Sequence, residues 1–242
     1  MPLTAIVLAA GEGTRMKSRH PKVVHNLLDK PIVWWTVRSA QAAGVERTIV
    51  VVSNHADEIK AALSDFDGIE YVEQTERLGT GHAVRVVRDA LGGFNGPVVV
   101  INGDAPLMRS ETIKALVDET RAHHNACTIL SMTPPDPAGY GRVIFSDGHV
   151  TGIVEHKDAT PEQREHEREC NVGVYCFCGG RLTANIDLIA NDNTQGEYYL
   201  TDVIALARAD GVAVHPVQVA SSFLAAGVNN KIQLAELERI FQ

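Results

Sequence analysis

The stretch LAAGEGTRMKSRHPK, residues 8–22, directly follows a short apolar run at the start of the chain. Gly11 and Gly13 allow the backbone to approach a ligand closely and to point its amide groups at an anion. Arg15 and Lys22 add a planar guanidinium and a compact ammonium to the same loop. The loop therefore combines the amides and the positive charges that a triphosphate requires.

This loop matches neither of the two common nucleotide-binding loops. The dinucleotide fingerprint GxGxxG is missing because Met16 stands where the third glycine would be, and the P-loop pattern GxxxxGK[ST] is missing as well. The residues on either side of the loop are therefore needed to decide the fold.

The first half of the chain alternates between short β-branched runs and amphipathic segments. Strands are expected at residues 5–8, 48–52, 69–72 and 97–101, and helices at 31–43, 54–63, 82–91 and 110–123. This β-α-β-α order predicts an α/β fold with a mixed, mainly parallel, Rossmann-like sheet and helices on both faces.

The second half is richer in strands. Strands are expected at residues 127–132, 141–145, 150–155, 172–177 and 212–219, helices at 181–190, 199–209 and 230–241, and a polar loop or short helix at 159–169. Asp147-Gly148 is typical of a hairpin turn. No linker or repeat interrupts the sequence, which predicts a single domain over residues 1–242, with residues 126–180 as a β elaboration of the same sheet.

Composition excludes several classes of protein. The 22 basic and 30 acidic residues give a net charge of −8 among 242 residues, which argues against a nucleic-acid binder. No run approaches the roughly 20 apolar residues of a membrane helix, and no basic segment precedes the first apolar run as in a signal peptide. The four cysteines lack zinc-ligand spacing and are interpreted as free thiols, which predicts a cytoplasmic protein.

The glycine-rich stretch resembles the G-x-G-T-R-M…P-K signature of the sugar-nucleotide pyrophosphorylases, a family of nucleotidyltransferases. Further segments resemble the family in the same order, namely QTERLGTGHA (74–83), NGDAPL (102–107), GYGRV (139–143), IVEHKDAT (153–160), CNVGVY (170–175), QGEYYLTD (195–202) and GVNNKIQL (227–234). Within the family, the chain is most similar to the uridyltransferase domain of the bifunctional enzyme that makes UDP-N-acetylglucosamine, a peptidoglycan precursor. The resemblance implies a fold of the nucleotide-diphospho-sugar transferase type.

The resemblance also implies a reaction and its catalytic residues. N-acetylglucosamine 1-phosphate would attack the α-phosphorus of UTP, and pyrophosphate would leave. Arg15 would hold the β- and γ-phosphates, and Lys22 would neutralise the crowded α-phosphate. Asp104 and Asn229 match the family's ligands for Mg²⁺, a hard cation that prefers oxygen.

The binding residues are assigned by the same resemblance. The nucleotide would be bound by Leu8, Ala10, Gly11, Gly13, Gln74, Gly79 and Thr80, with an amide side chain and backbone groups reading the uracil. The sugar would be bound by Asn102, Gly141, Glu155, Asn171, Tyr199 and Thr201, with Tyr199 helping to form the wall of the acetyl pocket.

Some features leave alternatives open. Asn102-Gly103-Asp104 replaces the family's usual YGD segment and removes an aromatic side chain near the sugar, so another sugar 1-phosphate or another NTP remains an alternative. A non-catalytic nucleotide-sugar sensor is a third reading, but such a protein has no need of Arg15 and Lys22 for pyrophosphate departure. The chain shows no hexapeptide repeat of a left-handed β-helix, so no acetyltransferase site is expected in it. The oligomeric state, and whether the chain is a stand-alone enzyme, stay open.

Overall fold

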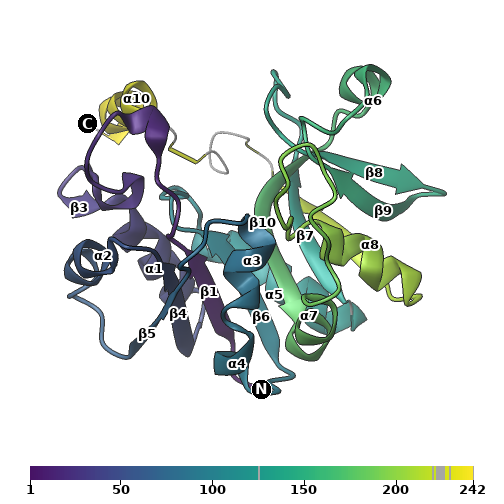
Figure 1. The fold of residues 1–242 in the computed structure, drawn as a ribbon, viewed down its shortest axis with the longest axis horizontal. Helices are drawn as coiled ribbons and strands as arrows, with labels where there is room; N and C mark the ends of the chain where they lie inside the picture. Colours follow the sequence, from purple (N-terminus) through teal and green to yellow (C-terminus); the bar gives the residue numbers. More distant parts are fainter. Residues whose placement is uncertain (125, 220, 222–226, 229, 242) are drawn as a thin grey trace.

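The computed structural model describes residues 1–124, 126–219, 221, 227–228 and 230–241. Its strands are β1 (Thr4–Leu8), β2 (Asn26–Leu27), β3 (Lys30–Pro31), β4 (Arg47–Val52), β5 (Ile69–Glu73), β6 (Pro97–Asn102), β7 (Cys127–Met132), β8 (Arg142–Ser146), β9 (His149–Val154), β10 (Cys170–Cys178) and β11 (Val214–Gln218). Over these described residues, nine strands form one sheet. Seven follow the order β11-β7-β10-β6-β1-β4-β5, while β8 pairs with β10 and β9 pairs with β8 (Figure 1).

The sheet is mixed and mainly parallel, as predicted. β1 pairs in parallel with β4 and β6, β4 with β5, and β7 with β11. β10 runs antiparallel to β6 and β7, and it inserts between them. The second half of the chain therefore extends the sheet that the first half begins.

Helices cover both faces of the sheet (Figure 1). The α-helices are α1 (Ile32–Ala42), α2 (Ala56–Ala62), α3 (Thr80–Arg85), α4 (Arg88–Leu91), α5 (Ser110–His123), α6 (Pro161–His166), α7 (Gly179–Asn185), α8 (Asp202–Ala209) and α10 (Lys231–Phe241). Successive residues of β1 point to opposite faces. Ala5 packs with residues of α1 and α5, and Ile6 packs with residues of α3, α4, α7 and α8.

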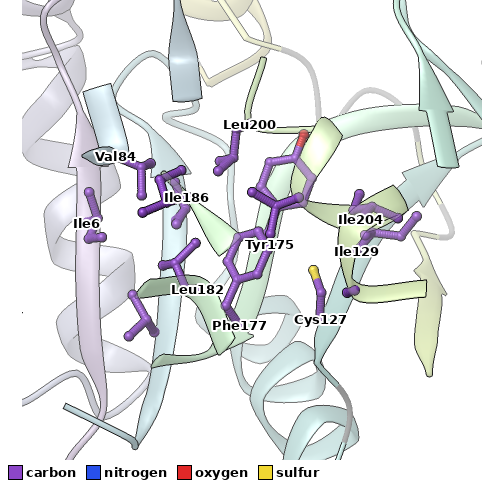
Figure 2. Close-up of a cluster of buried hydrophobic side chains, with 14 of the residues drawn as sticks. Ile6, Val84, Cys127, Ile129, Tyr175, Phe177, Leu182, Ile186, Leu200 and Ile204 are labelled. Carbon is purple, nitrogen blue, oxygen red and sulfur yellow. The ribbon is translucent and has the colours of Figure 1, made fainter. Parts of the chain in front are cut away.

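The larger core lies on the α7 and α8 side of the sheet. Figure 2 shows Tyr175 and Phe177 of β10 between Leu182 of α7 and Ile204 of α8. Each of these four side chains is at most 4% exposed. Burial of one such apolar side chain contributes about 1.5–3 kcal/mol. This core fixes β10, whose other end reaches the candidate site.

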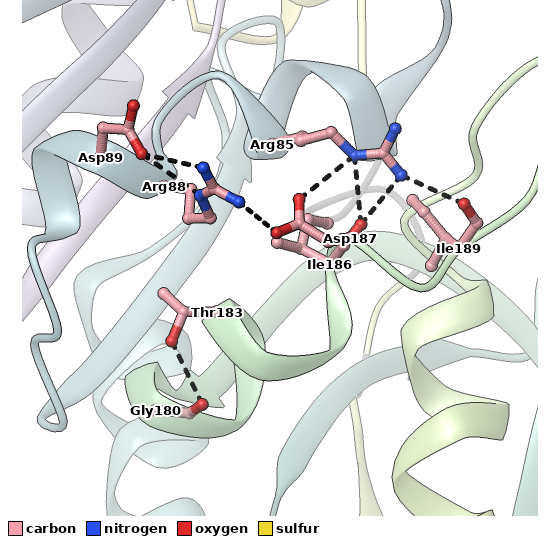
Figure 3. A network of polar contacts seen from close by, with 8 residues as sticks. All are labelled: Arg85, Arg88, Asp89, Gly180, Thr183, Ile186, Asp187 and Ile189. Carbon is pink, nitrogen blue, oxygen red and sulfur yellow. Dashed lines mark hydrogen bonds and ion pairs between the residues drawn. The ribbon is translucent and has the colours of Figure 1, made fainter.

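Two helices differ from their predicted bounds, and a set of side-chain contacts accounts for the end of the second. The segment expected as one helix over 82–91 is divided into α3 and α4, and the helix expected over 181–190 ends at Asn185. Arg85 donates to the carbonyl oxygens of Ile186 and Ile189, at 3.1 Å each, and Arg88 pairs with Asp187 (Figure 3). Backbone carbonyl oxygens after α7 therefore accept from the side chain of Arg85 in α3 instead of continuing the helix.

Other boundaries differ by a few residues. α2 begins at Ala56, so Asn54 does not cap it, and α8 begins at Asp202, three residues later than expected. The β8–β9 turn holds Asp147 and Gly148 at φ of 51° and 77°, which confirms the hairpin. Within the described ranges, no helix has the length and apolar character needed to cross a membrane.

Candidate active site

Two adjoining cavities lie where β1 and β6 end. The larger has a volume of about 360 Å³ and the smaller about 200 Å³. Leu8, Thr80 and Asn102 line both, so the two form one continuous site. Ligands of open α/β sheets bind at this carboxyl edge of the strands.

The cavities bring together most residues that the sequence singled out. The larger is lined by Leu8, Ala10, Gly11, Gly13, Arg15, Lys22, Gln74, Gly79, Thr80, Asn102 and Asp104. The smaller is lined by Asn102, Gly141, Glu155, Asn171 and Thr201. Most of the predicted nucleotide set thus lines the larger cavity and most of the predicted sugar set the smaller, while Leu8, Thr80 and Asn102 line both. Among the predicted residues that the structure describes, Tyr199 lines neither cavity, and Asn229 lies outside the described residues.

The glycine-rich loop is built around Gly13 and Lys22. Gly13 has a φ of 62°, a left-handed conformation that favours glycine. A β-carbon at this position would overlap the Cβ of Lys22. After Gly13 the chain makes a 3₁₀ turn over Thr14–Met16, which Met16 anchors by burying its side chain. The loop therefore folds back on itself and places Lys22 against the cavity.

The ends of β1 and β6 are held together directly. The amide of Gly103 donates to the carbonyl oxygen of Leu8 at 2.8 Å, and a β-carbon on Gly103 would lie 3.0 Å from that oxygen. Asp104 follows, and its Oδ2 forms an ion pair with Nζ of Lys22. The side chains of Lys22 and Asp104 are 12% and 21% exposed, so this pair is largely buried.

The surroundings of Asp104 fit a magnesium ion. A β-carbon on Gly227 would lie 3.2 Å from Oδ1 of Asp104, so the glycine leaves space beside that oxygen. No group of three or more His, Cys, Asp or Glu side chains is arranged to hold a metal in the part of the chain that the structure describes. Mg²⁺ is bound through one or two carboxylates together with substrate phosphates and waters. Asn229, the second predicted ligand, lies outside the described residues.

The Gln74–Gly79 loop is closed against residues 197–200. Gly79 has a φ of 103°, and a β-carbon there would lie 2.6 Å from the carbonyl oxygen of Tyr198. Gln74 is buried, and its amide nitrogen donates to the carbonyl oxygen of Gly79 at 3.2 Å. The hydroxyl of Thr80 accepts from the amide of Leu200 at 3.1 Å. Gly79 is thus required for the close packing of this loop against residue 198.

On the smaller cavity, a bulge in β10 orients Asn171. The register of β10 against β7 shifts between Asn171 and Tyr175. Nδ2 of Asn171 donates to the hydroxyl of Tyr175 at 2.7 Å, and its Oδ1 accepts from the amide of Gly173 at 3.0 Å. Asn102 donates to the carbonyl oxygen of Gly173 at 3.2 Å. The two amide side chains are therefore oriented by the same bulge.

Glu155 is the buried acid of the smaller cavity. Burial raises its pKa, and the nearby carboxylates of Asp158, Asp202 and Glu197 raise it further. The hydroxyl of Thr201 donates to Oε1 at 3.3 Å and partly opposes this shift. A desolvated carboxylate with one hydrogen bond retains capacity to accept from ligand hydroxyls.

Tyr199 is not among the residues that line either cavity. Its side chain is buried, and its hydroxyl accepts from Nε2 of Gln195 at 2.7 Å and lies 3.2 Å from Oδ2 of Asp158. The role predicted for Tyr199 beside the sugar stays a prediction. The residue lies three positions before the start of α8.

Several lining residues were missed from the sequence. The larger cavity also contains Thr14, Val23, Arg77, Ala83 and Glu197, and the smaller also contains Gly139, Tyr140, Val172, Gly173, Tyr175 and Leu200. Most lie inside the segments that carried the resemblance. These residues could have been predicted from their place in the same loops, because a loop that faces a cavity lines it with most of its residues.

Comparison with known proteins identifies the family. The profile of the MobA-like NTP transferase domain matches residues 5–162. The chain belongs to this family. It is therefore an NTP transferase domain, and its fold class agrees with the one predicted from the sequence.

Curated relatives of this MobA-like NTP transferase domain are about twice as long as the chain. The chain is 45% identical over 238 residues to the bifunctional protein GlmU of Geobacter metallireducens, covering 98% of this chain and 50% of that protein. It is 45% identical over 241 residues to the bifunctional protein GlmU of Neisseria meningitidis, covering 99% and 51%. The chain thus spans about half the length of these curated relatives.

One solved structure shares the fold. It is a putative glucose-1-phosphate thymidylyltransferase from Bacillus anthracis, crystallised with sucrose. The TM-score is 0.76 at 18% sequence identity, and the match covers 98% of this chain and 94% of that one. At this identity, the likeness concerns the fold alone.

Proposed function

We propose that this domain transfers the uridylyl group of UTP to N-acetylglucosamine 1-phosphate and releases pyrophosphate. The observation that carries the proposal is the joining of two cavities, one rich in cationic and glycine residues and one with a buried acid and oriented amides. The identity to the bifunctional GlmU proteins supports the choice of these substrates.

The larger cavity would bind UTP. Gln74 uses its amide nitrogen within the loop, so its carbonyl oxygen can accept from the N–H of uracil. Gly11 and Gly13 would offer backbone amides to the phosphates. Leu8, Ala10, Gly79 and Thr80 complete the part of the cavity next to the base.

Catalysis would rest on positioning and charge neutralisation. The attacking phosphate is already ionised at neutral pH, so no general base is needed. Arg15 would bind the β- and γ-phosphates and the departing pyrophosphate, and its guanidinium suits bidentate contacts. Lys22 would neutralise charge that builds up at the α-phosphate.

Asp104, with Asn229, would hold Mg²⁺. The ion would neutralise the two sets of phosphates that must approach each other. The Lys22–Asp104 ion pair keeps both side chains directed into the larger cavity.

The smaller cavity would bind the sugar. Glu155 would accept from sugar hydroxyls, and the backbone at Gly141 would contact the acetamido group. Asn102 and Asn171 would present amide groups held by the Gly173 bulge. The reaction would take place in the cytoplasm, where the four free thiols stay reduced.

A pyrophosphate-release panel over the four NTPs and several sugar 1-phosphates tests the proposal. UTP with N-acetylglucosamine 1-phosphate should give the highest kcat/KM. The Lys22→Ala variant, assayed in parallel, measures contaminating activity. A higher kcat/KM with another pair would reassign the substrates, and no release from any pair would overturn the proposed reaction.

A further inference from the structure

Arg77 connects three loops at the mouth of the larger cavity. It lies after β5 and lines the cavity. Its Nη1 forms an ion pair with Oε1 of Glu12 in the glycine-rich loop, and its Nη2 donates to Oδ1 of Asn54 at 2.8 Å. The loops that follow the neighbouring strands β1, β4 and β5 are thus linked through one guanidinium.

The position of Glu12 is unusual for its charge. It lies between Gly11 and Gly13, two residues that line the cavity proposed here for the nucleotide phosphates. A carboxylate there repels a polyanion unless a cation neutralises it. Arg77 provides that cation. The side chain of Arg77 lines the larger cavity, whereas Glu12 is not among the lining residues.

The ion pair is weak enough to exchange. The side chains of Arg77 and Glu12 are 36% and 52% exposed. Breaking an exposed ion pair of this kind changes an equilibrium constant, here that of nucleotide binding, by about fivefold at most. A charge-assisted contact between a guanidinium and a phosphate is worth about 10- to 100-fold in affinity. A bound triphosphate therefore competes successfully for the guanidinium.

We propose that Arg77 binds a phosphate of the nucleotide and that Glu12 competes with the nucleotide for it. Glu12 holds Arg77 at the cavity mouth. The Glu12–Arg77 ion pair must break before Arg77 binds phosphate, and this lowers the affinity for the nucleotide. This inference rests on the proposed function only in that an NTP occupies the larger cavity; the identity of the base and of the sugar does not enter it.

The test measures the Kd of the NTP by titration calorimetry, using whichever NTP the wild type turns over best. Arg77→Met should weaken binding about tenfold or more. Glu12→Gln should strengthen it about two- to fivefold, because Arg77 no longer has to leave a partner. In the double variant, Glu12→Gln should add little to the effect of Arg77→Met.

The double variant separates partner exchange from simpler effects. If Glu12 only repels phosphate, Glu12→Gln strengthens binding equally with and without Arg77. If the ion pair only stabilises the loops, both single variants weaken binding. Either result overturns the proposal, as does an unchanged Kd for Arg77→Met.

Arg47→Met is the matched control. Arg47 pairs with Glu70 at 2.7 Å at the opposite end of β4 and β5, and it lines neither cavity of the site. Its variant should keep the Kd of the wild type. Wild-type protein that binds no NTP would refute the proposed function together with this inference, whereas normal wild-type binding with unchanged variants would refute the inference alone.

Discussion

A β-carbon on Gly13 would overlap the Cβ of Lys22, so these two residues lie where they do only because position 13 carries no side chain. The left-handed φ of Gly13 turns the loop back on itself and brings Lys22 to Asp104. The glycine of the loop therefore positions a cation, in addition to any contact that its amide makes with phosphate.

Gly13→Ala should lower kcat by about 100-fold, because a displacement of about 1 Å at a reacting centre can cost that much. It should also destabilise the fold. Gly44→Ala is the control: Gly44 has a φ of 95°, but a β-carbon there meets nothing within 4 Å. That variant should show only the cost of backbone strain, about 1–2 kcal/mol, with unchanged kinetics. Wild-type kcat in Gly13→Ala would contradict the positioning role.

Lys22→Ala should lower kcat by about 10²–10³-fold, comparable to removal of one preorganised donor. Lys22→Arg should rescue poorly, because a planar guanidinium does not fit the space of a compact ammonium. Arg15→Ala should mainly raise the KM for UTP, since it binds phosphates that are charged before the reaction begins. Steady-state kinetics with UTP varied at saturating sugar phosphate distinguish these effects. An unchanged kcat for Lys22→Ala would limit that residue to binding.

Asp104→Asn should abolish most activity at any Mg²⁺ concentration while the far-UV circular dichroism spectrum stays that of the wild type. The substitution removes the only carboxylate proposed as a ligand, and it removes the negative charge that pairs with Nζ of Lys22. The wild type should lose activity with a chelator and regain it with Mg²⁺. Chelator-resistant activity in either protein would show that the site does not use a metal.

Much of the fold could be predicted because local patterns agree with the tertiary structure. The apolar runs of β1, β4 and β6 form strands buried on both faces, and the β-α-β-α order specifies parallel pairing. Helix ends were harder to predict. α7 ends where Arg85 takes the carbonyl oxygens of Ile186 and Ile189, and these lie about a hundred residues away in sequence.

The candidate site was predictable where chemistry depends on residue type and less so where it depends on packing. Arg15, Lys22 and Asp104 were assigned by charge and motif, and the structure places them in one cavity. Tyr199 is a predicted part of the sugar site, but its hydroxyl donates to Asp158 and its side chain lines neither cavity. Arg77 was missed because its partners Glu12 and Asn54 come from other loops, and single-sequence patterns do not reveal such pairs.

Glu155 links sugar binding to the pH dependence of stability. Burial raises its pKa in the folded protein above the ordinary value of 4.5. The folded state therefore holds the proton more tightly than the unfolded state. The resulting stabilisation is present below pH 4.5 and is lost as the pH rises through the folded-state pKa. Above that folded-state pKa, the wild type carries a desolvated negative charge beside Asp158 and Asp202.

Glu155→Gln should remove that charge and keep an oxygen that accepts from Thr201. Its Tm relative to the wild type should rise from acidic to neutral pH, because only the wild type is destabilised by ionisation. The KM for sugar phosphate should increase about tenfold or more, since a hydrogen bond to a charged acceptor is lost, while the KM for UTP stays unchanged. Thermal unfolding between pH 4 and pH 8, together with both KM values, checks these outcomes. A Tm difference that does not vary with pH would show that Glu155 is not penalised by burial, and an unchanged KM for sugar phosphate would remove it from the sugar site.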